Sequence, residues 1–420
     1  MSLLMKHTTT ITHSLLATHA NLLPENTQLC STDSISKHDA SYPEHRGSCH
    51  SDVSPELNGS EHNPYFRVGL AECPVAVLSV GSEARKILQT SFCAQVVAVF
   101  KSSFYVQNEQ GIFCVGVASL GRGPLQIQLA SDSDSLFNKL VSGGALAFHN
   151  EQAALLSDYT GLVTCTDNVS HEPARYFSER TLQMLDRFKP PSAAGFGWLV
   201  SEHSVEHASV CCARAMSGRA MSGYESLDTI DRGLRQQCYP ALRLLDSWLV
   251  SELSSTAEQR HAAAGSSSEQ VSKTEQQTTA KPPQDIRTLV GAGLGLTPSG
   301  DDLLAGVLLM LHRTRYGDQA QALWQMLEPS LVQRTNVISG AHLRMAAQAQ
   351  CAEPMLRVLD QLTASETPDA RGASNINNDS HLTARLVCAT VSSIGSLSGW
   401  DTLAGMSLVM RALLQHNVSN

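Results

Sequence analysis

The pattern of hydrophobic and polar positions changes near residue 170. Between Tyr65 and about residue 165, β-branched and aromatic runs such as "PVAVLSV" and "QVVAVFKSSFYVQNEQGIFCVGVASL" alternate with polar turns, which is typical of a strand meander. The segment Asn108–Gly111, "NEQG", is predicted to be a hairpin turn. Beyond Ser178, stretches such as "YPALRLLDSWLVSEL" place apolar residues three and four apart, which predicts helices. We therefore expect an α+β fold, with a β-rich N-terminal domain followed by a larger α-helical domain.

Composition and periodicity together place the boundaries. We expect a disordered tail over 1–62, where Ser, His, Asn and Thr are frequent, then a β-rich domain over 63–170 and a helical segment over 171–253. The polar stretch over 254–284, low in aromatic residues, is interpreted as a linker or insertion. The last unit, 285–420, is predicted to be an α-helical domain.

One short pattern occurs twice in that last unit. The sequence "SGDDLLAGVLLM", Ser299 to Met310, aligns without gaps with "SGWDTLAGMSLV", Ser398 to Val409. Both copies begin with Ser-Gly-x-Asp at a predicted helix N-terminus, and both carry a glycine inside the helix, at Gly306 and Gly405. Because glycine in a helix interior costs about 1 kcal/mol relative to alanine, we expect the two helices to approach closely there as pseudo-symmetric partners.

Two interpretations of the Ser-Gly-x-Asp starts remain open. In the first interpretation, each is a capping box, in which the Ser oxygen accepts from the amide three residues later and the Asp carboxylate accepts from the Ser amide. Alternatively, the glycines leave backbone N–H groups bare for an anion at two adjoining helix N-termini. The second interpretation assigns substrate or phosphate binding to Gly293, Gly295, Thr297, Gly300, Ser398, Gly399 and Asp401, and candidate catalytic roles to Ser299, Asp301 and Asp302.

Nucleotide-binding motifs, a metal site and a catalytic histidine have less support in this part of the sequence. A P-loop needs Gly-Lys-Ser/Thr before its helix, whereas two aspartates follow Gly300, and the preceding glycines do not complete G-x-G-x-x-G. Asp301 and Asp302 are candidate oxygen ligands for Mg²⁺, but the cap is expected to use one of them, so no metal site is assigned and the cofactor is unknown. His342, on a predicted helix, is interpreted as a structural residue.

The β-rich half contributes one candidate, the segment Gly121–Pro124, "GRGP", between two strand-like runs. It is either a surface turn with an idle arginine or a place where the planar guanidinium of Arg122 binds a carboxylate or phosphate. We assign Arg122 a catalytic role and Gly121 and Gly123 a substrate-binding role. The expected site is a cleft between the two halves, shared by Arg122 and Ser299.

The motifs "GLGLTPSGDDLLAG" and "SGWDTLAG", with "SLGRGPLQIQL" in the β-rich half, resemble the AllH family, named for a subunit of oxamate carbamoyltransferase. The resemblance spans about residues 65–415. It implies a subunit that, with others, converts oxalurate and phosphate to oxamate and carbamoyl phosphate in allantoin breakdown. Two alternatives remain: a non-catalytic assembly subunit, and a metal-dependent hydrolase or ligase of small carboxylates that uses Asp301 and Asp302. The Ser-Thr-Arg-Thr phosphate loop of familiar carbamoyltransferases is absent from the sequence.

Net charge, apolar runs and cysteine usage limit the classes of partner and the cellular location that we expect. A net charge of −9 argues against nucleic acid, which needs a basic face. No apolar run is long enough for a membrane span, and the N-terminus lacks the continuous apolar core of a signal peptide. The 11 cysteines include no C-x-x-C pair, which favours reduced thiols and a cytoplasmic location. The expected partners are a small anionic substrate and other subunits of the complex.

Overall fold

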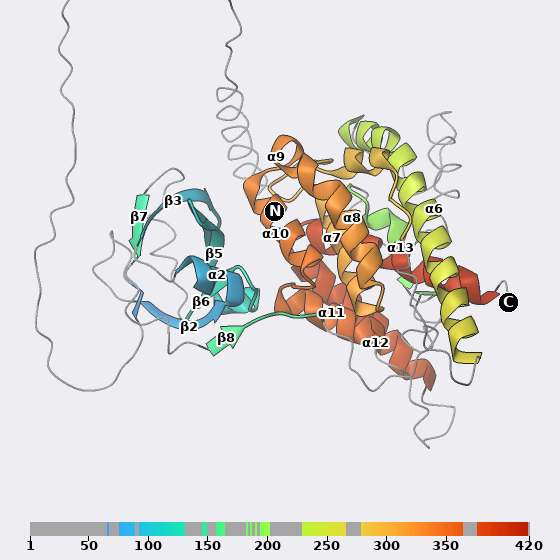
Figure 1. Cartoon of the computed structure of the whole chain (residues 1–420). Coiled ribbons are helices and arrows are strands. Elements are labelled where there is room, and N and C mark those ends of the chain that lie inside the picture. The colour runs from blue at the N-terminus through green and yellow to red at the C-terminus, as the bar shows by residue number, and fades with distance from the viewer. Residues whose placement is uncertain are drawn as a thin grey trace, which may run out of the picture. The chain divides into compact units, whose positions relative to one another are not determined.

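The computed structural model describes residues 65–66, 75–88, 92–130, 145–148, 157–163, 182–183, 185–186, 190, 194–201, 229–265, 279–363 and 376–418. The expected tail over 1–62 lies outside these residues. Residues Pro64–Asn420 form one compact unit. Strands occupy its N-terminal part and helices its C-terminal part (Figure 1), which confirms the predicted α+β fold.

The β-branched and aromatic runs form the strands β1 (Tyr65–Phe66), β2 (Val75–Gly81), β3 (Phe92–Val99), β4 (Ser103–Asn108), β5 (Gly111–Val117), β6 (Gln126–Leu129), β7 (Ala145–Phe148) and β8 (Ser157–Tyr159). Their order in the sheet is β1-β2-β6-β5-β4-β3-β7, and β8 pairs with β2. Neighbours β3, β4 and β5 are antiparallel, whereas β5 and β6 run parallel. The predicted hairpin turn is confirmed, because Asn108 pairs with Gly111 and its Oδ1 accepts from the N–H groups of Gln110 and Gly111.

The described helical part contains α6 (Thr229–Gly265), α7 (Ser299–Arg313), α8 (Gly317–Leu327), α9 (Leu331–Arg334), α10 (Val337–Ala347), α11 (Glu353–Thr363), α12 (Ile376–Ser393) and α13 (Ser398–Val418). Helix α6 continues to Gly265, so residues 254–265, which we expected to begin a linker, are helical. Their sequence, "SSTAEQRHAAAG", is rich in strong helix formers although it lacks an apolar stripe. Among the described helices, none combines the length and the apolar character needed to cross a bilayer.

Two apolar clusters hold the β-rich half in place. On one side of the sheet, the short helix α2 (Ser82–Ile87) buries Ala84 and Ile87 in a cluster with Phe104 and Phe113. A second, smaller cluster joins Ala98, Ile112 and Leu125 of the β-rich half to Ile338, Ala341 and Met345 of α10. The β-rich half therefore contacts the helical half directly, through buried apolar side chains.

Helices α7 and α13 pack against each other at their internal glycines. A Cβ atom on Gly306 would lie 2.0 Å from the carbonyl oxygen of Thr402, and one on Gly405 would lie 1.9 Å from that of Leu303. Each glycine thus lets its helix touch the backbone of the other at equivalent positions of the repeat. The predicted close, pseudo-symmetric approach is confirmed, and it explains why both helices tolerate glycine in their interiors.

Candidate functional site

The two Ser-Gly-x-Asp starts meet where α7 and α13 begin. The Thr297 Oγ1 atom lies 2.7 Å from the Ser398 Oγ atom, so the loop before α7 contacts the first residue of α13. The Ser299 hydroxyl hydrogen-bonds the carboxyl of Asp401 and lowers its pKa. The Ser398 hydroxyl acts in the same way on the carboxyl of Asp302. The serine of each motif therefore interacts with the aspartate of the other motif.

This exchange shows that the capping-box interpretation is wrong for α7. The N-cap residue is Pro298, with no hydrogen bond from a capping side chain, and Ser299 is already the first residue of the helix. The N–H groups of Asp301 and Asp302 donate to the Pro298 carbonyl oxygen at 2.9 and 3.1 Å. The spacing Ser-x-x-Asp is the same in both arrangements, so the sequence alone does not distinguish a bond within one helix from bonds between two helices.

Asp401 and Asp302 are neighbouring carboxyl groups with buried oxygen atoms. Asp401 is 1% exposed, and its Oδ1 accepts a hydrogen bond of 2.6 Å from the Phe196 N–H. Burial raises the pKa of Asp401 to about 7. Burial, followed by the charge of Asp401, raises the pKa of Asp302 well above its usual range. In the described part of the chain, the Oδ2 atoms of both residues have no hydrogen-bond partner. The pair can therefore hold a proton near neutral pH.

Asp301 fixes the glycine-rich loop to α10. Its Oδ1 accepts from the Gly291 N–H at 2.8 Å, and its Oδ2 accepts from the hydroxyls of Ser339, at 2.7 Å, and Thr335. Both oxygens are thus used in positioning the loop, which leaves the predicted catalytic and Mg²⁺-ligand roles of Asp301 without support. Among the described residues, no three His, Cys, Asp or Glu side chains are grouped so that they could hold a metal ion.

Gly300 and Gly399 are packed against the chain rather than open to a ligand. A Cβ atom on Gly300 would lie 2.0 Å from the Leu289 carbonyl oxygen, and one on Gly399 would lie 2.1 Å from that of Val391. Their N–H groups donate to backbone carbonyls of the preceding segments at 2.8 and 3.1 Å. The two amides are therefore not available to an anion, and this part of the hypothesis has no support in the structure.

The glycines of the preceding loop differ from this pair. Gly293 has a φ of 119° and Gly295 a φ of 111°, in the region that favours glycine. A Cβ atom on Gly293 would lie 2.8 Å from the Ser299 amide nitrogen, whereas Gly295 faces open space apart from one distant contact. These two glycines allow the loop to turn beside Thr297 without covering it with side chains.

The loop around Phe196 also belongs to this junction, although no sequence motif pointed to it. Gly195 has a φ of 69°, and a Cβ atom on it would lie 2.6 Å from Asp401 Oδ1 and 2.8 Å from Ser299 Oγ. The loop therefore closes over one Ser–Asp pair. Trp400, which replaces Asp301 in the second motif, is 3% exposed and contributes to the core of the helical part.

Tyr105 of β4 and His342 of α10 connect the two halves near Asp302. The Tyr105 Oη and His342 Nε2 atoms are 3.1 Å apart. Burial lowers the pKa of His342 to about 4, so the ring is neutral at pH 7. Burial raises the pKa of Tyr105 well above its usual range, and the Cys114 thiol and the charge of Asp302 add to this effect. Nothing in the sequence singles out Tyr105, because its partners come from distant segments.

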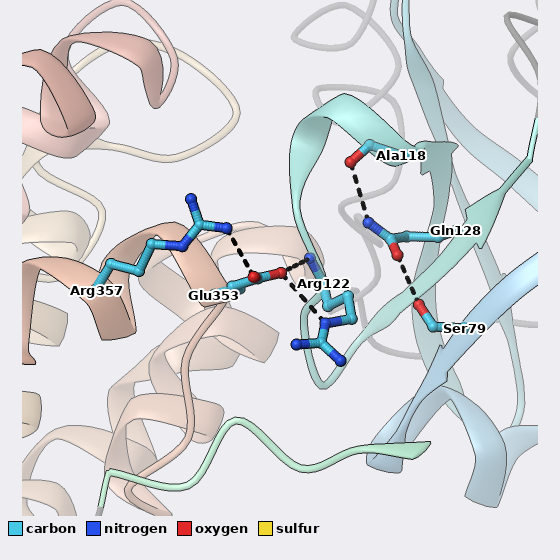
Figure 2. A network of polar contacts seen from close by, with 6 residues as sticks. All are labelled: Ser79, Ala118, Arg122, Gln128, Glu353 and Arg357. Carbon is cyan, nitrogen blue, oxygen red and sulfur yellow. Dashed lines mark hydrogen bonds and ion pairs between the residues drawn. The ribbon is translucent and has the colours of Figure 1, made fainter. Parts of the chain in front are cut away.

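Arg122 lies in a cavity of about 600 Å³ that neither Ser-Gly-x-Asp motif lines. Its Nε donates to Glu353 Oε2 at 3.3 Å and its backbone N–H to the same oxygen at 3.1 Å (Figure 2). Arg357 donates to the other carboxylate oxygen at 2.7 Å. The structure thus brings Arg122 to Glu353 and Arg357, and it does not place Arg122 and Ser299 in this one cavity.

Of the two neighbouring glycines, Gly121 allows this loop to approach α11. Gly121 has a φ of 78°, and a Cβ atom on it would lie 2.9 Å from Pro354 Cδ. A Cβ atom on Gly123 would make contacts of 3.4 Å or more, which are ordinary. The loop is fixed further because the Gln128 side chain donates to the Ala118 carbonyl oxygen at 3.1 Å (Figure 2). The substrate-binding roles of Gly121 and Gly123 stay predictions.

Both repeated motifs lie within the part of the chain that matches one family model. Residues 289–410 match the family model of oxamate carbamoyltransferase subunit AllH. The AllH match begins before α7 and ends inside α13, so it contains the whole junction of the two helix starts. The β-rich half, with Tyr105 and Arg122, lies outside the AllH match. No curated protein and no solved structure matches the chain.

Proposed function

We propose that this chain is a subunit of an oxamate carbamoyltransferase-like enzyme, which converts oxalurate and phosphate to oxamate and carbamoyl phosphate in allantoin catabolism. The observation that carries the proposal is the AllH match over residues 289–410, which contains the paired helix starts and their two carboxyl groups. The partners in this proposal are a small anionic substrate and the other subunits of the enzyme.

The chemistry of this reaction requires a proton at the leaving group. A phosphate oxygen bonds to the ureido carbon of oxalurate, and the bond from that carbon to the oxamate nitrogen breaks. The nitrogen must gain a proton to leave as a neutral amide. Protons are conserved in the overall reaction, because the proton that hydrogen phosphate loses on forming carbamoyl phosphate is the one that the oxamate nitrogen gains. A positioned acid contributes about 10²–10⁴-fold to such a step.

Asp302 is the proton donor in this proposal. Burial and the neighbouring Asp401 raise the pKa of Asp302 well above its usual range, which favours the protonated form that a donor needs. Its Oδ2 atom has no hydrogen-bond partner among the described residues. In the reverse direction the Asp302 carboxylate takes the proton from the oxamate amide. Thr297 and Ser398 orient this carboxyl group through their hydroxyls, which both lower its pKa.

A non-catalytic assembly subunit is the second candidate, and the packing of the motifs favours it. Gly300 and Gly399 contact backbone carbonyls, and Asp301 uses both carboxylate oxygens within the protein. These residues build the helix pair whether or not a substrate binds. A metal-dependent hydrolase or ligase has less support, because Asp301 is occupied in this way.

The test is oxalurate phosphorolysis, followed as carbamoyl phosphate formation by the chain alone and with the other subunits. Asp302→Asn is expected to lower kcat by about 10²-fold or more, because the amide cannot donate a proton of comparable acidity. The matched control is Asp318→Asn, at an exposed first-turn position of α8, which should leave kcat unchanged. If the complex needs the chain but Asp302→Asn is fully active, the assembly role is correct and the proton-donor role is refuted.

A further inference from the structure

The open cavity that contains Arg122 has the volume of a small-molecule site and a largely polar lining. Its volume of about 600 Å³ lies within the range usual for such sites, roughly 300–1,000 Å³. The loop after β5 forms one wall, and α11 and α12 form the others. The polar side chains that the argument uses are those of Ser119, Arg122, Glu353, Arg357, Thr390 and Ser393.

The Arg122 guanidinium is held in place but is not fully used. Its Nε atom donates to Glu353, and its Cζ atom lies 5.0 Å from the centre of the Tyr159 ring. The side chain is nevertheless 44% exposed, and its two Nη atoms have no hydrogen-bond partner within the described residues. A guanidinium fixed in this way presents a preorganised pair of donors that matches the oxygens of a carboxylate or phosphate.

The charges on the cavity wall do not balance. The hydrogen bond from Arg357 is the largest of the effects that lower the pKa of Glu353 to about 2, so Glu353 is a carboxylate at neutral pH. Among the described residues of the wall, one negative charge therefore faces two guanidinium groups. Arg357 contacts Glu353 through Nη2 alone and is 61% exposed, so its side chain can turn toward a ligand while α11 stays in place.

We propose that this cavity binds a small-molecule oxyanion, a carboxylate or a phosphate, through those N–H groups of Arg122 and Arg357 that have no partner among the described residues. The site is separate from the Asp302–Asp401 pair, and its occupation does not depend on the reaction proposed for that pair. In a purely structural role, the same ion pairs would only hold the Gly121–Pro124 loop against the first turn of α11.

The experiment is calorimetric titration of the full chain with phosphate and, separately, with oxamate, which distinguishes the two oxyanions. Arg357→Gln is expected to weaken binding about tenfold, the usual effect of losing one charge-assisted hydrogen bond. Glu353→Gln keeps an oxygen acceptor but removes the competing negative charge, so it is expected to strengthen binding severalfold. Arg385→Gln, at an exposed position of α12 outside the cavity lining, is the control and should bind as the unchanged chain does.

The opposite signs of the two main variants make the proposal falsifiable. It is overturned if neither anion binds at millimolar concentration, if Glu353→Gln binds more weakly than the unchanged chain, or if Arg357→Gln and Arg385→Gln bind equally. Thermal melts of each variant show whether it is folded. If Glu353→Gln does not fold, the comparison of Arg357→Gln with Arg385→Gln decides, because both replace partly solvated arginines at little cost in stability.

Discussion

The closest test of the repeated helix pair is Gly306→Ala. In an isolated helix this change stabilises by about 1 kcal/mol, because alanine loses less backbone entropy than glycine. Here the added Cβ would lie 2.0 Å from the Thr402 carbonyl oxygen, more than 1 Å short of an ordinary contact. That oxygen belongs to the backbone of α13, so no side-chain rotation relieves the overlap. The two helices must move apart.

The magnitude follows from these opposing effects. Overpacking a closely packed core costs about 1–3 kcal/mol, and separation of α7 from α13 adds to this because most of the interface is buried. After subtracting the helix-propensity gain, we expect the free energy of unfolding to fall by about 2 kcal/mol. For a unit of this size, at an unfolding entropy of about 2 cal/mol/K per residue, such a loss lowers Tm by roughly 3 °C.

Circular dichroism melts and urea titrations measure this effect. Gly340→Ala is the matched control, since Gly340 is also buried inside a helix, but its Cβ would meet only a Thr335 methyl carbon at 3.7 Å. This control should be neutral or stabilising by up to about 1 kcal/mol. A Gly306→Ala protein as stable as Gly340→Ala would refute the inference that backbone contact explains why both copies of the repeat have glycine at this position.

Three further predictions concern the junction and its surroundings. Because the folded-state pKa of Asp401 is raised to about 7, its contribution to stability is present below about pH 4 and is lost by about pH 7. The free energy of unfolding should therefore fall over this range by on the order of 4 kcal/mol at most. Asp401→Asn should remove this dependence in urea titrations from pH 4 to 8. Gly300→Ala, whose Cβ would lie 2.0 Å from the Leu289 carbonyl oxygen, should lower Tm even without ligand, and an unchanged Tm would contradict the packing described. Tyr105→Phe should cost about 1 kcal/mol by removing the hydroxyl beside His342, and equal stability would show that water replaces it.

The strands and the contact between α7 and α13 could be predicted from the sequence, the strands from the periodicity of apolar residues and the contact from the energetic cost of glycine inside a helix. The strand runs formed a sheet because their β-branched and aromatic residues suit a pleated, half-buried surface. The contact between α7 and α13 was predictable because Gly306 and Gly405 are unfavourable in helices unless a close approach compensates them. The boundary near residue 254 was less accurate, since a segment without an apolar stripe still formed the end of α6.

The site was harder to predict because its contacts join distant segments. The spacing of Ser299 and Asp302 indicates a hydrogen bond within one helix, and only the packing of α7 on α13 redirects it to the other motif. Arg122 is a suitable anion ligand by residue type, but its partner Glu353 comes from another half of the chain. Local patterns specify which groups are present, whereas tertiary packing decides which of them meet.

The reciprocal pairing of the two motifs has a consequence for how the sequence can diverge. A change at Ser299 alters the surroundings of Asp401, and a change at Ser398 alters those of Asp302, so a compensating substitution must arise in the opposite copy. Among related sequences, positions 299 and 401 should covary, as should 302 and 398, whereas the two positions within one motif need not. The two copies of the motif therefore form one structural unit, and neither copy can accumulate substitutions at these positions independently of the other.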